Sequence, residues 1–458
     1  MIRFVSSPVA VFTGLALVFG LLFALITAPF QAPDEHEHYF RAFQISEAMF
    51  IAQRSGDSVG GLLPKSLAEA TKVSEGIAGK TDKRQDLERL RMFAGFRYDA
   101  GQRMFIEFPN TALNFPTLYF PQAMGIAMGR ALGLSSLTFA YLARLCNLLA
   151  WLGIVMLAIK IIPVFKWVTV LLALTPMSLF LASSLSADAM TNAVSILFVA
   201  TVARVALDNE YRLSRGTVLF LLVLSVLVTL SKSVYITIVL LIFLIPVNKF
   251  GGRFAQLGFV MVCLSANIGV TWLWARTVQG LFVAMSPSEN PMPAEQISFL
   301  LSNPDEFLLA IGNTISTYYV ALARQLIGVL GWLDIRLNPW VYALSYCLLL
   351  GFSLLDSRSD VVIGRRSKLI IFAALFAGVL LIFTALYVKW NSVGNDIVTG
   401  MQGRYFIPLS ILWWFLFYNV GPAAKKVAPR ALGVIACLFC FLVLSYCSYK
   451  LLTRYYIV

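Results

Sequence analysis

Runs of about 20 apolar residues, separated by short polar turns, recur along most of this 458-residue chain. A helix needs about 20 apolar residues to cross a bilayer, so each run predicts one membrane-spanning helix. The pattern predicts about eleven spans. They cover residues 8–28, 137–159, 166–184, 189–207, 216–231, 233–247, 254–275, 338–355, 369–388, 404–420 and 431–451. We therefore expect an all-α polytopic membrane protein.

Two long segments interrupt the apolar runs, and we expect both on the extracytoplasmic side. Residues 29–136 form a large first loop, expected to carry juxtamembrane helices, and residues 276–337 form a second extracytoplasmic segment. The apolar stretch 118–134 is expected to lie in or dip into the outer interface, because a full span there would reverse the charge bias of later turns. Residues 304–328 are expected to form a surface helix.

The positions of Lys and Arg set the expected orientation. With Arg3 in the cytoplasm, the basic turns fall on the cytoplasmic side, as the positive-inside rule requires. These turns contain Lys160, Lys166, Arg204, Arg212, Arg215, Lys249, Arg253, Arg358, Arg365, Arg366, Lys368, Lys425, Lys426 and Arg430. The first apolar run lacks a convincing cleavage pattern, so we expect it to remain as an uncut first helix with a cytoplasmic N-terminus.

Composition supports a membrane protein and excludes two other classes. Hydrophobic residues make up 59% of the chain and charged residues 13%, whereas a soluble domain carries about 25% charged residues. The net charge of +13 comes mostly from short turns between apolar runs, which is typical of membrane topology rather than of nucleic-acid binding. We expect one membrane domain over residues 1–458, in contact with the lipid bilayer and with no nucleic acid.

Ionisable residues crowd against the outer end of the first span. The segment reads PDEHEHYFR over residues 33–41. In a structural interpretation, Asp34 caps a helix and Glu37 closes a capping box. In a functional interpretation, a carboxylate here acts as general base at the membrane boundary, and His38 and Arg41 tune or orient it. Both interpretations can hold for one short segment.

The same segment contains the only two histidines of the chain, His36 and His38. Glu35 and His38 have a Glu-x-x-His spacing, which can ligate a divalent ion. The sequence offers no second cluster of ligands to complete such a site. A divalent metal is therefore the less favoured alternative, and the sequence indicates no certain cofactor.

Three more ionisable residues occupy outer turns. Asp188 either caps the span that begins there or faces the same cavity as Asp34. Lys232 either snorkels to lipid headgroups or holds a phosphate where two helices meet. Asp334 is a weaker candidate, whose alternative role is that of a solvated acid in a turn.

The last outer turn contains the segment Gln402-Gly403-Arg404-Tyr405. Gly400 and Gly403 allow the backbone to approach a ligand closely. Arg404 can bind a phosphate through two parallel hydrogen bonds. Alternatively, Arg404 is an interfacial anchor beside Tyr405 in an aromatic belt. We retain Gln402 and Tyr405 as further active-site candidates.

These candidates are expected on one face of the membrane although they come from independent loops. The acids are Asp34, Glu35 and Asp188, and the cations are Arg41, Lys232 and Arg404. A base beside a phosphate-binding set suits transfer from a lipid-phosphate carrier to a hydroxyl acceptor.

Four separated segments together resemble a family of bacterial membrane proteins of unknown function. They are residues 33–46 (PDEHEHYFRAFQIS), 60–67 (GGLLPKSL), 331–334 (GWLD) and 402–406 (QGRYF). The resemblance covers nearly the whole chain. That family is similar in layout to the GT-C glycosyltransferases, which have a first helix, a long outside loop with an essential acid near its start, and many spans. The resemblance implies a GT-C-like fold in a bacterial inner membrane.

The resemblance also implies roles by position. It implies Asp34 as the base, with Glu35 as the competing choice, and Asp188 as the acid of the second outside turn. Lys232 lies in a Leu-Ser-Lys turn similar to the family's Leu-Thr-Lys pattern, although Ser233 replaces the Gly or Pro expected after that lysine. The GT-C enzymes use polyprenyl-phosphate or polyprenyl-diphosphate sugars as donors, and several need no metal.

The expected function is that of a membrane glycosyltransferase. It would move a sugar from a polyprenyl-phosphate-linked donor to a hydroxyl of a cell-envelope glycan or lipid-linked acceptor, at a site facing the periplasm or exterior. Lys232, Arg404 and Arg41 are the candidates for holding the donor phosphate. The main alternative is a transporter or flippase of lipid-linked glycans, but the sequence has no evident repeat and its charges cluster at the outer boundary. A non-enzymatic assembly or scaffold protein is a third possibility.

Overall fold

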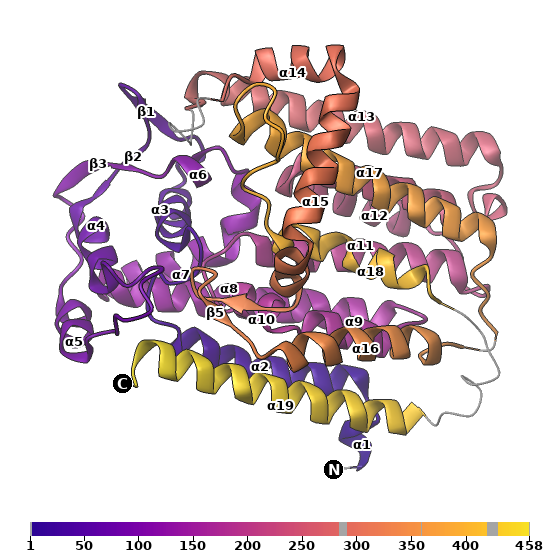
Figure 1. Cartoon of the computed structure of the whole chain (residues 1–458), viewed down its shortest axis with the longest axis horizontal. Coiled ribbons are helices and arrows are strands. Elements are labelled where there is room, and N and C mark those ends of the chain that lie inside the picture. The colour runs from indigo at the N-terminus through magenta and orange to yellow at the C-terminus, as the bar shows by residue number, and fades with distance from the viewer. Residues whose placement is uncertain (1, 284–290, 359, 419–428, 458) are drawn as a thin grey trace.

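A computed structural model describes residues 2–283, 291–358, 360–418 and 429–457 (Figure 1). Long helices run side by side along the longest axis of the molecule, and a mixed region of short helices and strands lies at one end. The expected mostly helical membrane architecture is confirmed at this level. Two small antiparallel sheets were not predicted from the sequence.

The first long helix has a clear local cause for its start. Ser7 precedes α2 (Pro8–Ile26), and its Oγ accepts a hydrogen bond from the backbone N–H of Ala10 at 3.2 Å. Pro8 occupies the first turn, where a missing N–H costs nothing. The short α1 (Ile2–Val5) precedes it, and α2 packs against α8 (Ser136–Ile161) and α19 (Pro429–Tyr455).

The first long loop folds into short helices around a three-stranded sheet of order β1-β2-β3. Its elements are α3 (Glu35–Ser46), β1 (Gln53–Ser55), β2 (Ser58–Pro64), α4 (Lys65–Thr71), η1 (Lys72–Ser74), α5 (Leu87–Gly95), β3 (Arg103–Glu107), α6 (Pro109–Ala112), η2 (Pro116–Tyr119) and α7 (Phe120–Ala131), where η denotes a 3₁₀ helix. In register, Gly60 lies opposite Gln53 and Glu107. With 12 residues, α7 is about 18 Å long, so it is too short to cross a bilayer.

The bundle is built from the later elements. They are α9 (Lys166–Ala173), α10 (Pro176–Ala182), α11 (Asp188–Leu207), α12 (Arg215–Ser231), η3 (Ser233–Leu244), η4 (Val247–Phe250), α13 (Arg253–Thr277), α16 (Pro339–Leu355), α17 (Arg365–Trp390), η6 (Gly403–Phe406) and α18 (Ile407–Phe415). Helix α11 is the most enclosed of the long helices, because 89% of the residues in its most apolar stretch are buried.

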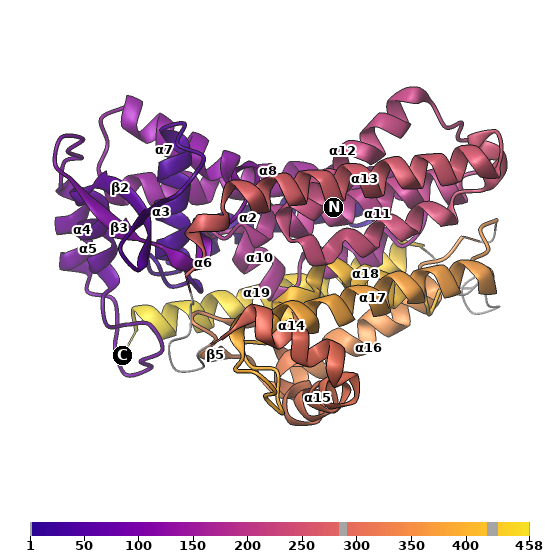
Figure 2. The same ribbon diagram turned by 90° about the horizontal axis from the view of Figure 1, so that it is seen from above.

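The second long segment projects from one side of the bundle. It contains η5 (Gln279–Leu281), α14 (Pro293–Ser302), α15 (Pro304–Ile327), β4 (Val329–Leu330) and β5 (Ile335–Arg336). Figure 2 shows α15 projecting from one side of the long helices, whereas α14 contacts α17. The surface helix expected over residues 304–328 corresponds to α15, most of whose side chains are exposed.

Within the described residues, six helices are long and apolar enough to span a membrane by length and composition, namely α2, α8, α11, α13, α17 and α19. The apolar helices α12, η3 and α16 are shorter. The span expected over 166–184 is broken into α9 and α10, because Pro176 cannot donate to the helix ladder. The span expected over 404–420 contains only η6 and α18, and its last two residues lie outside the described part. A multi-pass membrane protein follows, and the count of about eleven spans stays a prediction.

Candidate functional site

Asp34 directly precedes α3, but its side chain does not cap that helix. Its backbone φ is 57°, in the left-handed region, and its carboxylate makes no capping hydrogen bond. Asp adopts this region more readily than most residues. The capping-box interpretation is wrong for this helix, and Glu35 Oε2 instead accepts from the N–H of Ala32 at 3.2 Å. The Asp34 carboxylate is therefore free to face other groups.

Four charged side chains from separate elements meet at the end of the bundle that carries the first loop. Lys232 Nζ lies 2.7 Å from Asp188 Oδ1. The Arg404 guanidinium lies between two carboxylates, with Nη2 3.6 Å from Asp34 Oδ2 and Nη1 3.6 Å from Asp188 Oδ2. We call Asp34, Asp188, Lys232 and Arg404 the charge cluster. The carboxylates of Asp34 and Asp188 offset part of the cost of burying Arg404.

The sequence left open a capping role for Asp188, snorkelling of Lys232 and interfacial anchoring by Arg404, and the structure shows none of these three roles in the described residues. Asp188 begins α11, yet its carboxylate contacts Lys232 and Arg404 and makes no capping hydrogen bond. The hydroxyl of Ser186 accepts from the N–H of Asp188 at 3.2 Å instead. Lys232 points to Asp188 rather than outward to headgroups. Arg404 is buried, so it is not an anchor at an exposed interface.

In the described residues, the Arg404 guanidinium has N–H groups that donate to no acceptor. Its side chain is 5% exposed, and in the described part of the chain neither Nε nor Nη1 has a hydrogen-bond acceptor. Contacts of 3.6 Å to carboxylates are too long to count as hydrogen bonds. Buried donors without acceptors are costly and rare. Asp34 and Lys232, by contrast, are about one-third exposed, so the cluster is accessible from outside and suited to an anionic ligand.

Arg404 is positioned by helix α15 and by the start of η3. The side chain of Gln325 on α15 accepts from the N–H of Gly403 at 2.7 Å. A Cβ on Gly403 would lie 2.1 Å from the carbonyl oxygen of Leu322, so glycine is needed here for the approach to α15 rather than to a ligand. Tyr235 Oη donates to the carbonyl of Tyr405 at 2.8 Å.

Tyr405 completes the surroundings of the cations. Lys232 Nζ lies 4.7 Å from the centroid of its ring, and Arg404 Cζ lies 5.6 Å from it. Both distances are within the range of cation–π attraction. The ring of Tyr405 therefore forms part of the electrostatic surroundings of both cations.

Glu35 does not join the charge cluster, because it forms a buried ion pair. Arg144 on α8 donates from Nε to Oε1 at 2.8 Å and from Nη2 to Oε2 at 2.7 Å. The same guanidinium donates to the carbonyls of Ala24, Thr27 and Ala28 at the end of α2. Glu35 Oε1 also accepts from the N–H of Leu185 at 3.1 Å. One ion pair thus fixes the turn that carries Asp34 and the turn that leads to Asp188.

His38 is buried beside the charge cluster and is held neutral. Its Nδ1 lies 2.8 Å from Tyr119 Oη, which in turn accepts from Asn114 Nδ2 at 2.9 Å. Burial lowers the pKa of His38 to about 4, more than the carboxylates of Asp34 and Asp188 raise it. His38 therefore stays uncharged at neutral pH.

Glu37, which was expected only to close a capping box, pairs with Asn110 at the start of α6. Asn110 Nδ2 donates to Glu37 Oε1 at 2.7 Å and to Asp34 Oδ1 at 3.4 Å, and the Asn110 N–H donates to Glu37 Oε2 at 2.7 Å. Burial, followed by the charge of Asp34, raises the pKa of Glu37 to about 7. The Glu37 carboxyl group, which titrates near neutrality, therefore lies next to the Asp34 carboxylate.

Two other predicted residues of this segment lie apart from the charge cluster. Arg41 donates from Nη2 to the carbonyls of Phe50 and Asn114 at 2.8 and 2.9 Å, so it fixes the loop. Burial lowers its pKa to about 10. His36 stacks on Trp332, with ring centroids 6.1 Å apart, and burial lowers its pKa.

Two predicted residues from later turns also have other surroundings. Asp334 forms a buried ion pair with Arg454, with Nη2 2.8 Å from Oδ2. It is therefore neither solvated nor part of the charge cluster. The backbone carbonyl of Gln402 accepts from the N–H of Tyr405 at 3.1 Å. Among the described residues, the buried Oε1 of Gln402 has no hydrogen-bond partner.

Possible metal ligands do not converge in the described residues, where no group of three His, Cys, Asp or Glu side chains is placed to hold an ion. The two residues with the Glu-x-x-His spacing have separate partners. Glu35 binds Arg144, and His38 contacts Tyr119.

Sequence reasoning missed two residues that build this site. Arg144 is an arginine inside a predicted span, and a charge at such depth is by itself a signal of function or of a buried partner. Asn110 had no comparable signal, because an Asn in a long polar loop is ordinary. Its importance follows only from its contacts with Glu37 and Asp34.

Comparison with known proteins identifies a family but no activity. No match was found among curated proteins or among solved structures. Residues 17–413 match a family model described as "Predicted membrane protein (DUF2142)". This match includes all four residues of the charge cluster and most of the bundle. The chain therefore belongs to this family of membrane proteins.

Proposed function

We propose that the protein is a membrane glycosyltransferase that uses a polyprenyl-phosphate-linked sugar as donor. The observation that carries the proposal is the Arg404 guanidinium, buried between Asp34 and Asp188 with unused donors. A phosphate oxygen accepts hydrogen bonds from such a group through two parallel contacts. Lys232 adds a second cation at the accessible side. We leave Arg41 out of the proposed phosphate site, because its Nη2 donates to the carbonyls of Phe50 and Asn114 and it forms no ion pair with the charge cluster in the described residues.

The proposed reaction is a displacement at the anomeric carbon of the sugar. The acceptor hydroxyl of a cell-envelope glycan or lipid-linked acceptor attacks this carbon, and its proton passes to the Asp34 carboxylate. The bond between the anomeric carbon and the phosphate oxygen breaks, and that oxygen keeps the electron pair. Arg404 and Lys232 stabilise the charge of the departing polyprenyl phosphate. The products are a glycosylated acceptor, polyprenyl phosphate and one proton on Asp34.

Asp34 is better suited than Glu35 to act as the base. Its carboxylate is about one-third exposed, whereas both oxygens of Glu35 are buried and accept hydrogen bonds from Arg144. A general base must reach the hydroxyl from which it removes a proton. Asp188, held by Lys232, is proposed to orient the cations.

The proposed setting is a bacterial inner membrane, with a GT-C-like arrangement of about eleven crossings. Helix α2 leads from the N-terminus into the first loop, where Asp34 directly precedes α3, so the length of α2 separates the N-terminus from Asp34 (Figure 1). A cytoplasmic N-terminus would therefore place the charge cluster towards the periplasm or exterior, where lipid-linked glycans are accepted.

Transport or flipping of lipid-linked glycans is the second candidate function. The break between α9 and α10 at Pro176 favours it, because transporters often use discontinuous helices. The charge cluster argues for the enzyme, since its residues lie at the ends of their elements rather than midway along them. The two functions differ in whether a glycosidic bond forms.

The experiment uses purified protein with a radiolabelled polyprenyl-phospho-sugar and a lipid-linked glycan acceptor. We expect sugar transfer by the wild type and a loss of about 10²- to 10⁴-fold in Asp34→Asn, because the general base is removed. Asn tolerates the left-handed backbone at this position, so the melting temperature and donor binding should be retained.

Asp57→Asn is the matched control, since Asp57 is fully exposed in the first loop, and it should transfer sugar as the wild type does. Full activity of Asp34→Asn would exclude Asp34 as the base. Movement of the labelled lipid between leaflets without transfer would support the flippase instead.

A further inference from the structure

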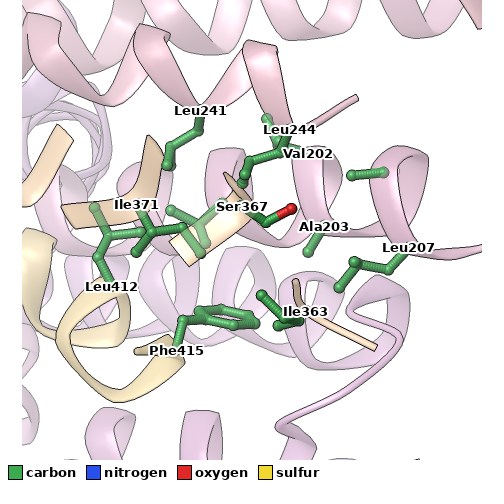
Figure 3. Close-up of a pocket in the computed structure, with 12 residues that line it drawn as sticks. Val202, Ala203, Leu207, Leu241, Leu244, Ile363, Ser367, Ile371, Leu412 and Phe415 are labelled. Carbon is green, nitrogen blue, oxygen red and sulfur yellow. The ribbon is translucent and has the colours of Figure 1, made fainter. Parts of the chain in front are cut away.

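An apolar pocket lies at the other end of the elements that carry the charge cluster (Figure 3). The space between its lining side chains, counted together with the part open to solvent, is about 410 Å³. It is bounded by α11, η3, α17 and α18, through side chains such as Ala203, Leu244, Ile371 and Phe415. Apart from Ser367, whose hydroxyl points into the pocket, the side chains that line it are apolar.

This pocket is separate from the charge cluster. On α11, Asp188 is the first residue and Ala203 is fifteen positions later, so the two lie about 22 Å apart along the helix. The same order holds on η3, where Lys232 directly precedes the helix and Leu244 ends it. A ligand of the pocket would therefore occupy the opposite side of the proposed membrane from the sugar donor.

Basic side chains border the pocket at the start of α17. Arg365, Arg366 and Lys368 surround Ser367 in sequence, and the two arginines are exposed. In the part of the chain that the structure describes, none of the three forms an ion pair, whereas Arg204 and Arg358 at the same end pair with Asp208 and Asp360. The start of α17 thus carries positive charge with no protein partner, next to an apolar opening.

We propose that this pocket binds an acyl chain of an anionic phospholipid, whose phosphate is held by Arg365 and Arg366. An alkyl chain packs against apolar side chains through van der Waals contacts, because a lipid tail is as apolar as a leucine side chain. Arginine guanidinium groups match the geometry of a phosphate. A lipid with net negative charge gains from the unpaired cations, whereas a zwitterionic lipid carries a compensating positive group.

The test compares lipids retained by the full-length protein. The protein is placed in nanodiscs of equal parts phosphatidylglycerol and phosphatidylcholine with identical chains, and bound lipids are counted by native mass spectrometry after release. We expect phosphatidylglycerol to be retained over phosphatidylcholine by about fivefold for each arginine that contributes. Equal retention of the two lipids by the wild type would overturn the proposal.

Two variants locate the site. Ala203→Phe fills the pocket and should release the retained phosphatidylglycerol. Arg365→Gln with Arg366→Gln leaves the pocket intact and should make the retention of the two lipids equal. As a surface change, it should not disturb folding.

Arg253→Gln is the control, because it removes an exposed arginine from the start of α13 and should keep the wild-type preference for phosphatidylglycerol. The proposal fails if the double arginine variant keeps the preference, or if a folded Ala203→Phe protein does.

Discussion

At the residue scale, Glu35 and Glu37, the two acidic residues near Asp34, have different hydrogen-bond partners. Glu35 is fully paired with Arg144. The Glu37 carboxylate accepts hydrogen bonds from the side chain and the backbone N–H of Asn110 and remains near the charge of Asp34. A buried carboxyl group next to a carboxylate resists ionisation, since both burial and the like charge favour its protonated form.

The stability of the protein should depend on pH through Glu37. Its pKa is about 7 in the folded protein and 4.5 when exposed. Between pH 4.5 and pH 7 the Glu37 carboxyl group keeps its proton in the folded state and loses it in the unfolded state. Its contribution to the free energy of unfolding is therefore fully present below pH 4.5 and is lost as the pH rises through 7. The full effect is about 3 kcal/mol. We expect the melting temperature of Glu37→Gln, relative to the wild type, to rise from pH 5 to pH 8.

The control is His38→Asn, for which the expected change of the relative melting temperature with pH has the opposite sign. The pKa of His38 is lowered from 6.5 to about 4, so the unfolded state gains a proton first as pH falls below 6.5. The relative melting temperature of His38→Asn should therefore rise towards low pH. A flat difference between Glu37→Gln and wild type over pH 5 to 8 would mean that Glu37 is ionised throughout.

The sequence indicated the residues of the charge cluster but not how they are held. Asp34, Asp188, Lys232 and Arg404 were detectable because each is an ionisable residue at the end of an apolar run. The sequence could not predict that Glu35 lies outside the charge cluster, because Glu35 directly follows Asp34 in the chain. The left-handed backbone at Asp34 accompanies the turn of the two side chains to different partners.

At the element scale, the approach of η6 to α15 determines where Arg404 lies. Gly403→Ala would place its Cβ within 2.8 Å of both the carbonyl of Leu322 and the backbone of Leu326. The turn must then move away from α15 and take Arg404 with it. We expect a loss of about 1–3 kcal/mol in stability from the overpacking, together with weaker donor binding in the transfer assay.

Gly269→Ala provides the comparison for this change. Gly269 lies on α13 with open space around its Cβ position, so the melting temperature should be unchanged or slightly higher, because Ala favours helix. If Gly403→Ala and Gly269→Ala have the same stability and activity, the close approach to α15 does not position Arg404.

Hydrophobic runs predicted the long helices well and the interrupted ones poorly. The expected span 137–159 corresponds to α8, because its apolar run is continuous. The break of 166–184 had a visible cause in Pro176. The β1-β2-β3 sheet had no clear signal, since β1 has only three residues and all are exposed.

At the scale of the whole molecule, the last helix is tied to the first loop. Arg454 on α19 donates to the carbonyls of Ile77, Lys80 and Lys83 and pairs with Asp334. Arg454→Ala would leave Asp334 buried without its partner, which typically costs about 3–5 kcal/mol. We expect a lower melting temperature and faster hydrogen exchange in residues 77–85.

Arg358→Ala is the control, because the Arg358–Asp360 pair is more than half exposed and such surface pairs contribute little to stability. Its melting temperature and exchange should match those of the wild type. Unaltered exchange of residues 77–85 in Arg454→Ala would show that other contacts hold the loop in place.

The buried pair between Glu35 and Arg144 has a mechanical consequence. Because the Glu35–Arg144 pair binds both the turn before Asp34 and the turn before Asp188 to α8, a tilt of α8 would carry Asp34 and Asp188 together. Arg404 is attached instead to α15. Relative displacement of these two helices would thus widen or narrow the gap between the acids and Arg404 while the spacing of the two acids stayed constant.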